Sequence, residues 1–135
     1  EDTLKAVVRM AKRTNKKLKI LAVTVLTSIS NSSIKKIGHT RPIQELVKKQ
    51  AILAKACGCH GIVCAVSDLR FVKKIFKGEI FTPGIRLKGD NVGDQKRVSG
   101  PKAAFKNGST SIVMGRSIIK NNIKKNIQRL IEELK

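Results

Sequence analysis

The sequence is poor in acidic and aromatic residues, and both shortages limit what it can do. Its 135 residues include 9 Asp and Glu against 29 Lys and Arg, four Phe, and neither Trp nor Tyr. So few aromatic rings leave nucleic-acid bases almost nothing to stack on, and no helix-turn-helix or RNP-type motif is present. The formal net charge of +20 still favours anionic partners. Because the lysines are dispersed over segments with helical patterns, we interpret them as a solvated outer face rather than a nucleic-acid surface.

Long apolar runs and metal-binding motifs are also missing. No run approaches the ~20 residues that a helix needs to cross a bilayer, and the first residues, EDTLKAVVRMAKR, lack the contiguous apolar stretch of a signal peptide. The cysteines at 57, 59 and 64 are odd in number and have no Cys-x-x-Cys spacing, which argues against disulfides and zinc. We therefore expect a soluble cytoplasmic protein with no metal and no membrane contact, whose cysteines pack in the core or at turns.

Strand-like and helix-like patterns alternate four times along the chain. The run KILAVTVL is nearly continuous in apolar and β-branched residues, which is typical of a strand buried on both faces of a parallel sheet. Between such runs, apolar residues recur at helical spacing. The predicted helices are 3–13, 42–57, 67–77, 101–107 and 122–134, and the predicted strands are 19–26, 61–66, 79–82 and 111–114. This alternation predicts βαβ units with a parallel sheet, so residues 1–135 form one α/β domain.

In each unit, polar residues follow directly after the strand. Parallel strands end at the same edge of a sheet, where α/β sheets and (β/α)8 barrels bind ligands. Gly115 and Arg116 follow the last strand and suit a phosphate, because glycine lets backbone N–H groups approach and arginine offers a charged fork. Residues 83–97 form a long loop that is suited to close over a ligand. Taken alone, these features fit a simple turn and a mobile surface loop equally well.

Five segments in order give a more specific signal than any one of them. They are VTVLTS (23–28), HGIVCAVSD (60–68), FTPGIR (81–86), GDQKRV (93–98) and VMGRSI (113–118). Together they resemble the C-terminal half of orotidine 5′-monophosphate decarboxylase, over nearly the whole chain. The resemblance implies strands five to eight of a TIM (β/α)8 barrel. It also implies decarboxylation of orotidine 5′-monophosphate to uridine 5′-monophosphate without any cofactor, a step of pyrimidine biosynthesis.

The resemblance also assigns substrate contacts position by position. Thr27 matches the hydroxyl residue that helps to hold the pyrimidine ring, and Pro83 matches a turn that shapes one wall of the pocket. Arg86 and Gln95 match the loop that closes on the phosphate, and Gln95 also reaches toward the base. The Gly-Arg pair after the last strand matches the phosphate cradle. The predicted substrate-binding residues are Thr27, Pro83, Arg86, Gln95, Gly115 and Arg116.

The catalytic charges of that family have no counterpart in this sequence. In the family, alternating Lys and Asp side chains from strands one to three, in a Lys-Phe-x-Asp-Ile-type segment, act on the substrate carboxylate together with an Asp of the partner subunit. No such segment occurs among the 135 residues, so we predict that this chain alone is inactive. Its sheet has two open edges, and we expect a complementary N-terminal half, self-association or a longer gene product. The alternatives are an inactive remnant that binds nucleotide phosphates and a basic nucleic-acid-binding protein.

Overall fold

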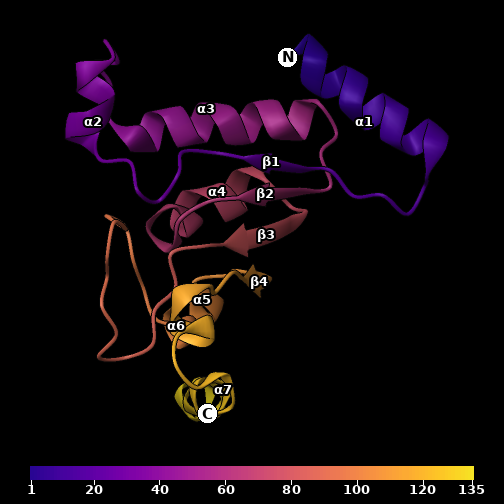
Figure 1. Cartoon of the computed structure of the whole chain (residues 1–135). Coiled ribbons are helices and arrows are strands. Elements are labelled where there is room, and N and C mark those ends of the chain that lie inside the picture. Colours follow the sequence, from indigo (N-terminus) through magenta and orange to yellow (C-terminus); the bar gives the residue numbers. More distant parts are fainter.

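The computed structural model describes residues 1–135 and contains four parallel strands that are connected through helices (Figure 1). The strands are β1 (Leu21–Val23), β2 (Gly61–Val63), β3 (Glu79–Thr82) and β4 (Ser111–Ile112), and they lie in the sheet in chain order. The helices are α1 (Asp2–Thr14), α2 (Asn31–Lys36), α3 (Ile43–Ala56), the 3-10 helix η1 (Val66–Asp68), α4 (Leu69–Ile75), α5 (Pro101–Lys106), α6 (Arg116–Ile119) and α7 (Ile123–Leu134). Every neighbouring pair of strands is parallel, so the predicted α/β class is confirmed.

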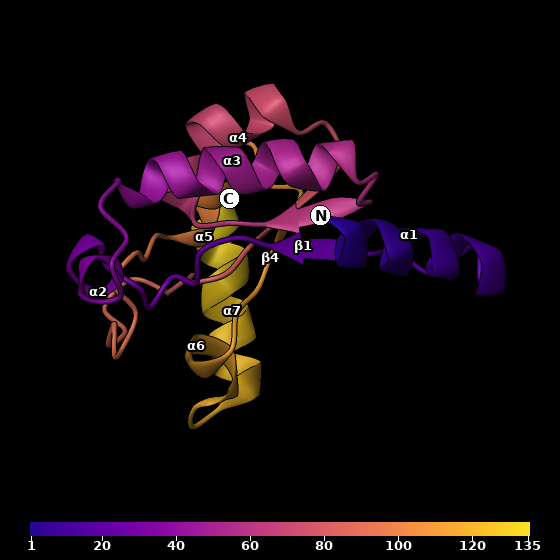
Figure 2. The same ribbon diagram turned by 90° about the horizontal axis from the view of Figure 1, so that it is seen from above.

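The main hydrophobic core lies on one side of this sheet. Ala22, Ile62 and Ile80 are partners in register across β1, β2 and β3. Ile62 is fully buried and packs in one cluster with Val47 of α3 and Leu69 of α4. Figure 2 shows both of these helices on the same side of the strands. Since each fully buried aliphatic side chain contributes about 1.5–3 kcal/mol, this sheet–helix layer supplies most of the apolar stabilisation.

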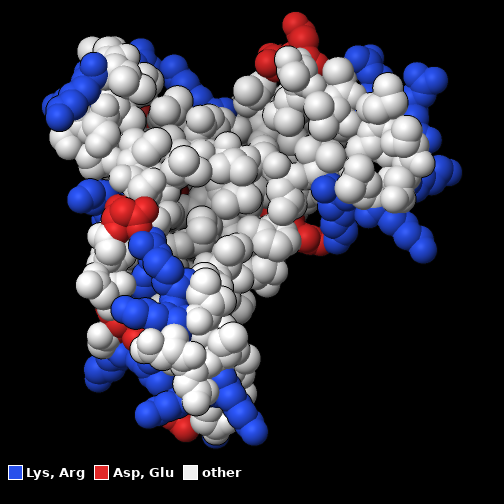
Figure 3. All heavy atoms as spheres, in the orientation of Figure 1, with Lys and Arg blue, Asp and Glu red and all other residues white.

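The opposite face of the sheet has no helical cover. Val23, Val63 and Phe81 form the next row in register, and alternate residues of a strand point to opposite faces. Val23 is 58% exposed, and Val113 just after β4 is 50% exposed. On the face shown in Figure 3, Lys and Arg gather over α1, α2 and the region of α6 and α7, and the surface over the strands carries almost no charge. We call this uncharged surface the bare sheet face.

The two outer strands, β1 and β4, each lack a strand on one side. Helix α7, which lies beyond β4 in Figure 1, carries exposed Ile123, Ile127 and Ile131 at helical spacing. Both edges of the sheet thus leave backbone groups unpaired, with apolar side chains exposed nearby. Every lysine of the chain is exposed, and their role as a merely solvated outer face stays a prediction.

The structure corrects several predicted boundaries. Residues 27–40, where neither a helix nor a strand is predicted, contain the short helix α2, whose first turn is capped by the Ser30 hydroxyl accepting the Ser33 N–H over 3.2 Å. A six-residue helix with one buried apolar residue, Ile34, has too little periodicity to be recognised. Pro42 caps α3 instead of lying in its first turn. The one-turn helix α6 was not predicted, and the predicted strand 19–26 is regular only at Leu21–Val23.

Candidate functional site

The long loop between β3 and α5, residues 83–100, begins and ends in a closed stem. The Arg86 N–H donates to the Ser99 carbonyl over 3.0 Å, and the Ser99 N–H donates to the Gly84 carbonyl over 3.2 Å. Gly84 has a φ of +76°, and a Cβ there would stand 2.8 Å from the Arg97 carbonyl oxygen and 3.2 Å from Cγ2 of Thr27. Only glycine fits this position without strain. The stem therefore holds the β3–α5 loop directly against the segment that follows β1.

Two of the predicted residues, Thr27 and Gln95, meet within this arrangement. The Thr27 hydroxyl donates a hydrogen bond to the side-chain oxygen of Gln95. The Thr27 backbone carbonyl accepts the N–H groups of Lys96 and Arg97 over 3.0 and 3.1 Å. Thr27 is buried and Gln95 half-buried. Residues from the ends of β1 and of the β3–α5 loop are thus joined into one hydrogen-bonded unit, although 68 positions separate them in the sequence.

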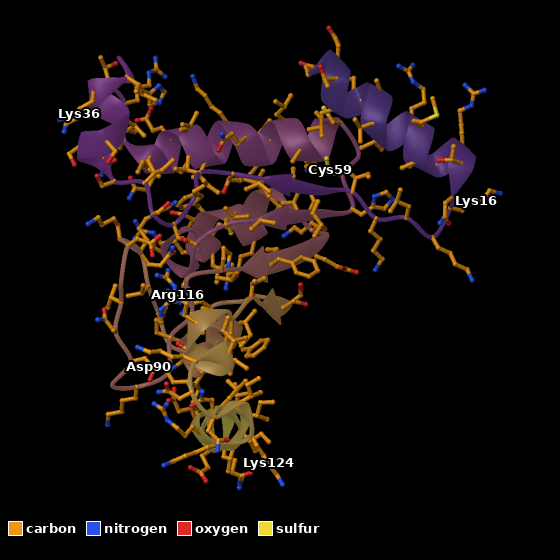
Figure 4. All side chains as sticks on the ribbon, in the orientation of Figure 1. Lys16, Lys36, Cys59, Asp90, Arg116 and Lys124 are labelled. Atoms are coloured by element: carbon orange, nitrogen blue, oxygen red, sulfur yellow. The ribbon has the colours of Figure 1, made fainter.

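Gly115 and Arg116 lie at the start of α6, and Figure 4 shows Arg116 beside the β3–α5 loop. Apart from Gly115 itself and its two chain neighbours, no residue has a heavy atom within 4 Å of the point where a Cβ on Gly115 would stand. The Arg116 guanidinium is about half exposed and pairs with the Asp94 carboxylate of the loop. The hydrogen bond from Arg116 holds the pKa of the Asp94 carboxyl below its ordinary value. Arg116 therefore already binds one oxyanion, and open space lies at the neighbouring glycine.

The structure brings together most of the predicted set, but it does not link the Arg86 side chain to the rest. Contacts run from Thr27 to Gln95, and from Asp94, which precedes Gln95, to Arg116. The Arg86 Nη1 instead donates to the carbonyl of its neighbour Ile85 over 2.9 Å, and its Nε is buried without a partner. Pro83, half-buried, precedes the glycine of the stem. A contact between Arg86 and a ligand stays a prediction.

Sequence reasoning missed a buried ion pair beneath the loop. The Arg97 Nη1 lies 2.5 Å from Oδ2 of Asp68, and their side chains are 13% and 0% exposed. Burial, and after it the charge of Asp68, raise the pKa of the nearby Cys64 thiol to about 12, although Arg97 acts in the opposite direction. Cys64 belongs to the hydrophobic core, as predicted. The available signal was an acid directly after the second strand and an arginine two residues after Gln95.

A second ion pair ties the first half of the loop to α7. The Arg129 Nη2 donates to the Lys88 carbonyl over 2.9 Å and to Oδ1 of Asp90 over 3.0 Å, and Glu133 accepts the Lys88 N–H over 2.8 Å. Burial alone would raise the pKa of Asp90, but the nearby Ser117 hydroxyl and Arg129 guanidinium outweigh it and leave this pKa below its ordinary value. The β3–α5 loop is thus anchored on both sides of its tip, residues 91–95.

A hollow of about 440 Å³ lies between residues 89–93 of the loop and residues 116–129 of α6 and α7. No hydrophobic residue lines it, and Arg116, Lys120 and Arg129 outnumber the one acidic lining residue, Asp90, which gives it a positive character. This environment suits an anion.

No group of three or more His, Cys, Asp or Glu side chains is placed to hold a metal ion. None of the helices combines the length and apolar composition required to span a membrane.

Four parallel β/α units, with polar side chains gathered where the strands end, have the architecture of half of a (β/α)8 barrel. Residues 1–129 match the model of a protein family described as Orotidine 5′-phosphate decarboxylase / HUMPS family. The chain belongs to this family.

Individual relatives agree with this assignment. The chain is 41% identical over 101 residues to an orotidine 5′-phosphate decarboxylase of Coxiella burnetii (strain RSA 493 / Nine Mile phase I), which covers 73% of this chain and 43% of the relative. It is 42% identical over 121 residues to the enzyme of the same name from Afipia carboxidovorans, with 87% and 50% covered. The chain thus spans about half the length of the curated relatives that it matches.

Solved structures show the same partial overlap. The crystal structure of orotidine 5′-phosphate decarboxylase from Lactobacillus acidophilus matches with a TM-score of 0.66 and 31% identity over 86% of this chain and 49% of the other. The enzyme from Methanocaldococcus jannaschii, complexed with the inhibitor BMP, matches with a TM-score of 0.69 over 98% of this chain and 56% of the other. At 22% identity, this second likeness supports the fold alone. These overlaps of about half agree with the predicted half barrel, and its assignment to strands five to eight stays a prediction.

The contact between Asp94 and Arg116 leads to a testable expectation. Replacing Asp94 by asparagine removes the carboxylate that occupies the Arg116 guanidinium. Since an exposed ion pair is weak, we expect uridine 5′-monophosphate to bind roughly two- to five-fold more tightly, with no change for uridine. Titration calorimetry with both ligands measures the effect. Weaker binding of the nucleotide would show that Asp94 orients Arg116 for the phosphate instead of competing with it.

Proposed function

We propose that the chain supplies the phosphate- and pyrimidine-binding half of an orotidine 5′-monophosphate decarboxylase. The observation that supports this best is the run of contacts from Thr27 through Gln95 and Asp94 to Arg116. This run supports the proposal because residues that the family resemblance assigns to the base and to the phosphate are neighbours in it. All of these residues lie beyond the strand ends, where barrels of this kind bind substrates.

In this proposal, one nucleotide spans the site from Thr27 to Arg116. Arg116 exchanges the Asp94 carboxylate for the substrate phosphate, which also lies in the open space at Gly115. Gln95 is a neutral donor and acceptor, and from its place beside Thr27 it reaches both the base and the phosphate. The net charge of +20 assists the capture of a dianionic phosphate. No metal or organic cofactor takes part, and the setting is cytoplasmic pyrimidine biosynthesis.

Decarboxylation in this family uses an array of Lys and Asp side chains from a Lys-Phe-x-Asp-Ile-type segment, and no such segment occurs in this sequence. We propose that a complementary N-terminal half, with the Lys-Phe-x-Asp-Ile-type segment, covers the bare sheet face and pairs with the edges of β1 and β4. The exposure of Val23 and Val113 on that face and of the α7 isoleucines supports a covering partner. Self-association of the chain is the other way to cover the same surface.

The experiment that tests the proposal measures carbon dioxide release from orotidine 5′-monophosphate. The purified chain alone should release none above the uncatalysed rate, whereas the chain mixed with an N-terminal half should be active, and Arg116→Ala should impair the mixture. Decarboxylation by the chain alone would show that the division between binding and chemistry is wrong. Binding of uridine 5′-monophosphate without turnover in any mixture would favour an inactive nucleotide-binding protein.

A further inference from the structure

The buried pair of Arg97 and Asp68 is connected to more than one strand end. Besides the contact to Asp68 at 2.5 Å, the Arg97 guanidinium donates from Nη2 to the carbonyls of Val25 over 2.7 Å and Leu26 over 3.3 Å. Asp68 ends η1, which follows β2, whereas Val25 and Leu26 follow β1. Arg97 itself belongs to the β3–α5 loop. One side chain therefore ties together the segments that leave three consecutive strands.

This network surrounds Thr27 and Gln95, two residues that contact the substrate in the proposed function. Gln95 lies two residues before Arg97, and Thr27 lies two residues after Val25. The backbone N–H of Arg97 also donates to the Thr27 carbonyl over 3.1 Å. Fixing Arg97 against Val25 thus sets the distance between the backbones of Thr27 and Gln95, whose side chains are in contact.

We infer that Arg97 is a positioning residue, which holds the tip of the β3–α5 loop so that Gln95 meets Thr27 in the geometry that binds the nucleotide. The inference rests on the proposed function for its ligand, but its structural part is independent of any ligand. Arg97 touches no substrate and acts through Gln95.

Stability alone does not account for this pair. Removing two charges from water is costly, and well-packed apolar residues of similar volume often replace a buried ion pair without loss of stability. Asp68 is fully buried and Arg97 nearly so, and therefore both side chains lose most of the hydration of their charges. What apolar residues cannot reproduce is the planar fork, which bonds a carboxylate and two carbonyls in fixed directions. The geometry of the fork explains why an arginine lies here.

The first test measures amide hydrogen exchange in the free chain. Arg97→Lys keeps a positive charge opposite Asp68 but loses the fork, and the double variant Asp68→Leu with Arg97→Met replaces the whole pair by apolar side chains. In both, the N–H groups of residues 96 and 97, which bond to Thr27, should exchange at least about tenfold faster, while those of α3 stay unchanged. Arg70→Lys, on the exposed face of α4, is the matched control. Unchanged exchange at 96 and 97 in both variants would overturn the inference.

The second test couples Arg97 to Gln95 through nucleotide affinity. Arg97→Lys should weaken binding of uridine 5′-monophosphate about tenfold in the normal chain, but hardly at all when Gln95 is already alanine. Full additivity of the two losses would overturn the inference, since Arg97 would then act independently of Gln95. If the normal chain binds no uridine 5′-monophosphate, the proposed function fails, and the exchange test still decides the role of Arg97.

Discussion

Replacing Arg116 by alanine is expected to weaken binding of uridine 5′-monophosphate by about 1.5–3 kcal/mol, the usual size for a hydrogen bond to a charged group. This loss corresponds to roughly a 10- to 150-fold rise in the dissociation constant. Arg116 lies beside the β3–α5 loop, and its present partner is the exposed carboxylate of Asp94, which a phosphate can replace. Uridine has no phosphate, so its affinity should stay the same. Titration calorimetry with both ligands measures the difference.

The matched control for this prediction is Arg70→Ala. Arg70 lies on the exposed side of α4, and its loss lowers the net charge by the same single unit without touching the site. It should reduce nucleotide affinity only slightly, through the long-range field. Equal losses for uridine and its phosphate in Arg116→Ala, or equal losses in the two variants, would mean that Arg116 does not bind the phosphate.

Replacing Ile62 by alanine is expected to lower the free energy of unfolding by about 2–5 kcal/mol, because the deletion leaves a cavity in a closely packed core. Ile62 is fully buried in the central strand β2, where it packs with residues of α3 and α4. A domain of this size is stabilised by only about 5–15 kcal/mol in total, so the variant should be close to unfolding. Urea denaturation followed by circular dichroism measures the change.

Val23→Ala is the comparison that tests which face of the sheet is the core. Val23 belongs to the neighbouring strand β1 but lies on the bare sheet face, with 58% of its surface exposed. Its truncation should cost less than about 1 kcal/mol in the isolated chain, the ordinary range for surface positions. If both truncations destabilise the chain equally, the bare sheet face is covered in solution, by self-association or by a different packing.

The alternation of strands and helices could be predicted from the sequence because each strand is a short apolar run and each long helix has a clear apolar stripe. The limits of the strands could not be predicted, since the β-branched residues Ile20, Thr24 and Val25 continue the run beyond the regular part at Leu21–Val23. Helix α2 escaped detection because polar contacts fix it in place of an apolar stripe: the Ser30 hydroxyl caps its first turn, and the Asn31 side chain accepts the N–H of Ile43, the first residue of α3, over 2.9 Å.

For the site, the sequence predicted which residues lie after the strands, and the family resemblance chose among them. Thr27 contacts Gln95, and Arg116 contacts the neighbouring Asp94, while the binding of a nucleotide by these residues stays a prediction. The pair of Arg97 and Asp68 was missed because 29 positions separate its members and nothing in local spacing marks them as partners. Long-range pairing of this kind depends on how the strand ends meet in space, which no periodicity encodes.

The lysines and arginines around the bare sheet face also influence which surface can cover it. Two copies of the chain placed face to face would each carry a net charge of +20, part of it on the Lys and Arg side chains that flank this face. At 0.1 M salt the Debye length is about 10 Å, so charges that close would still repel one another. If the surface that covers this face had acidic residues around its edge, those residues would attract the Lys and Arg side chains of this chain. Apolar contacts would stabilise this interface, and electrostatics would favour an acidic partner over a second copy of the chain.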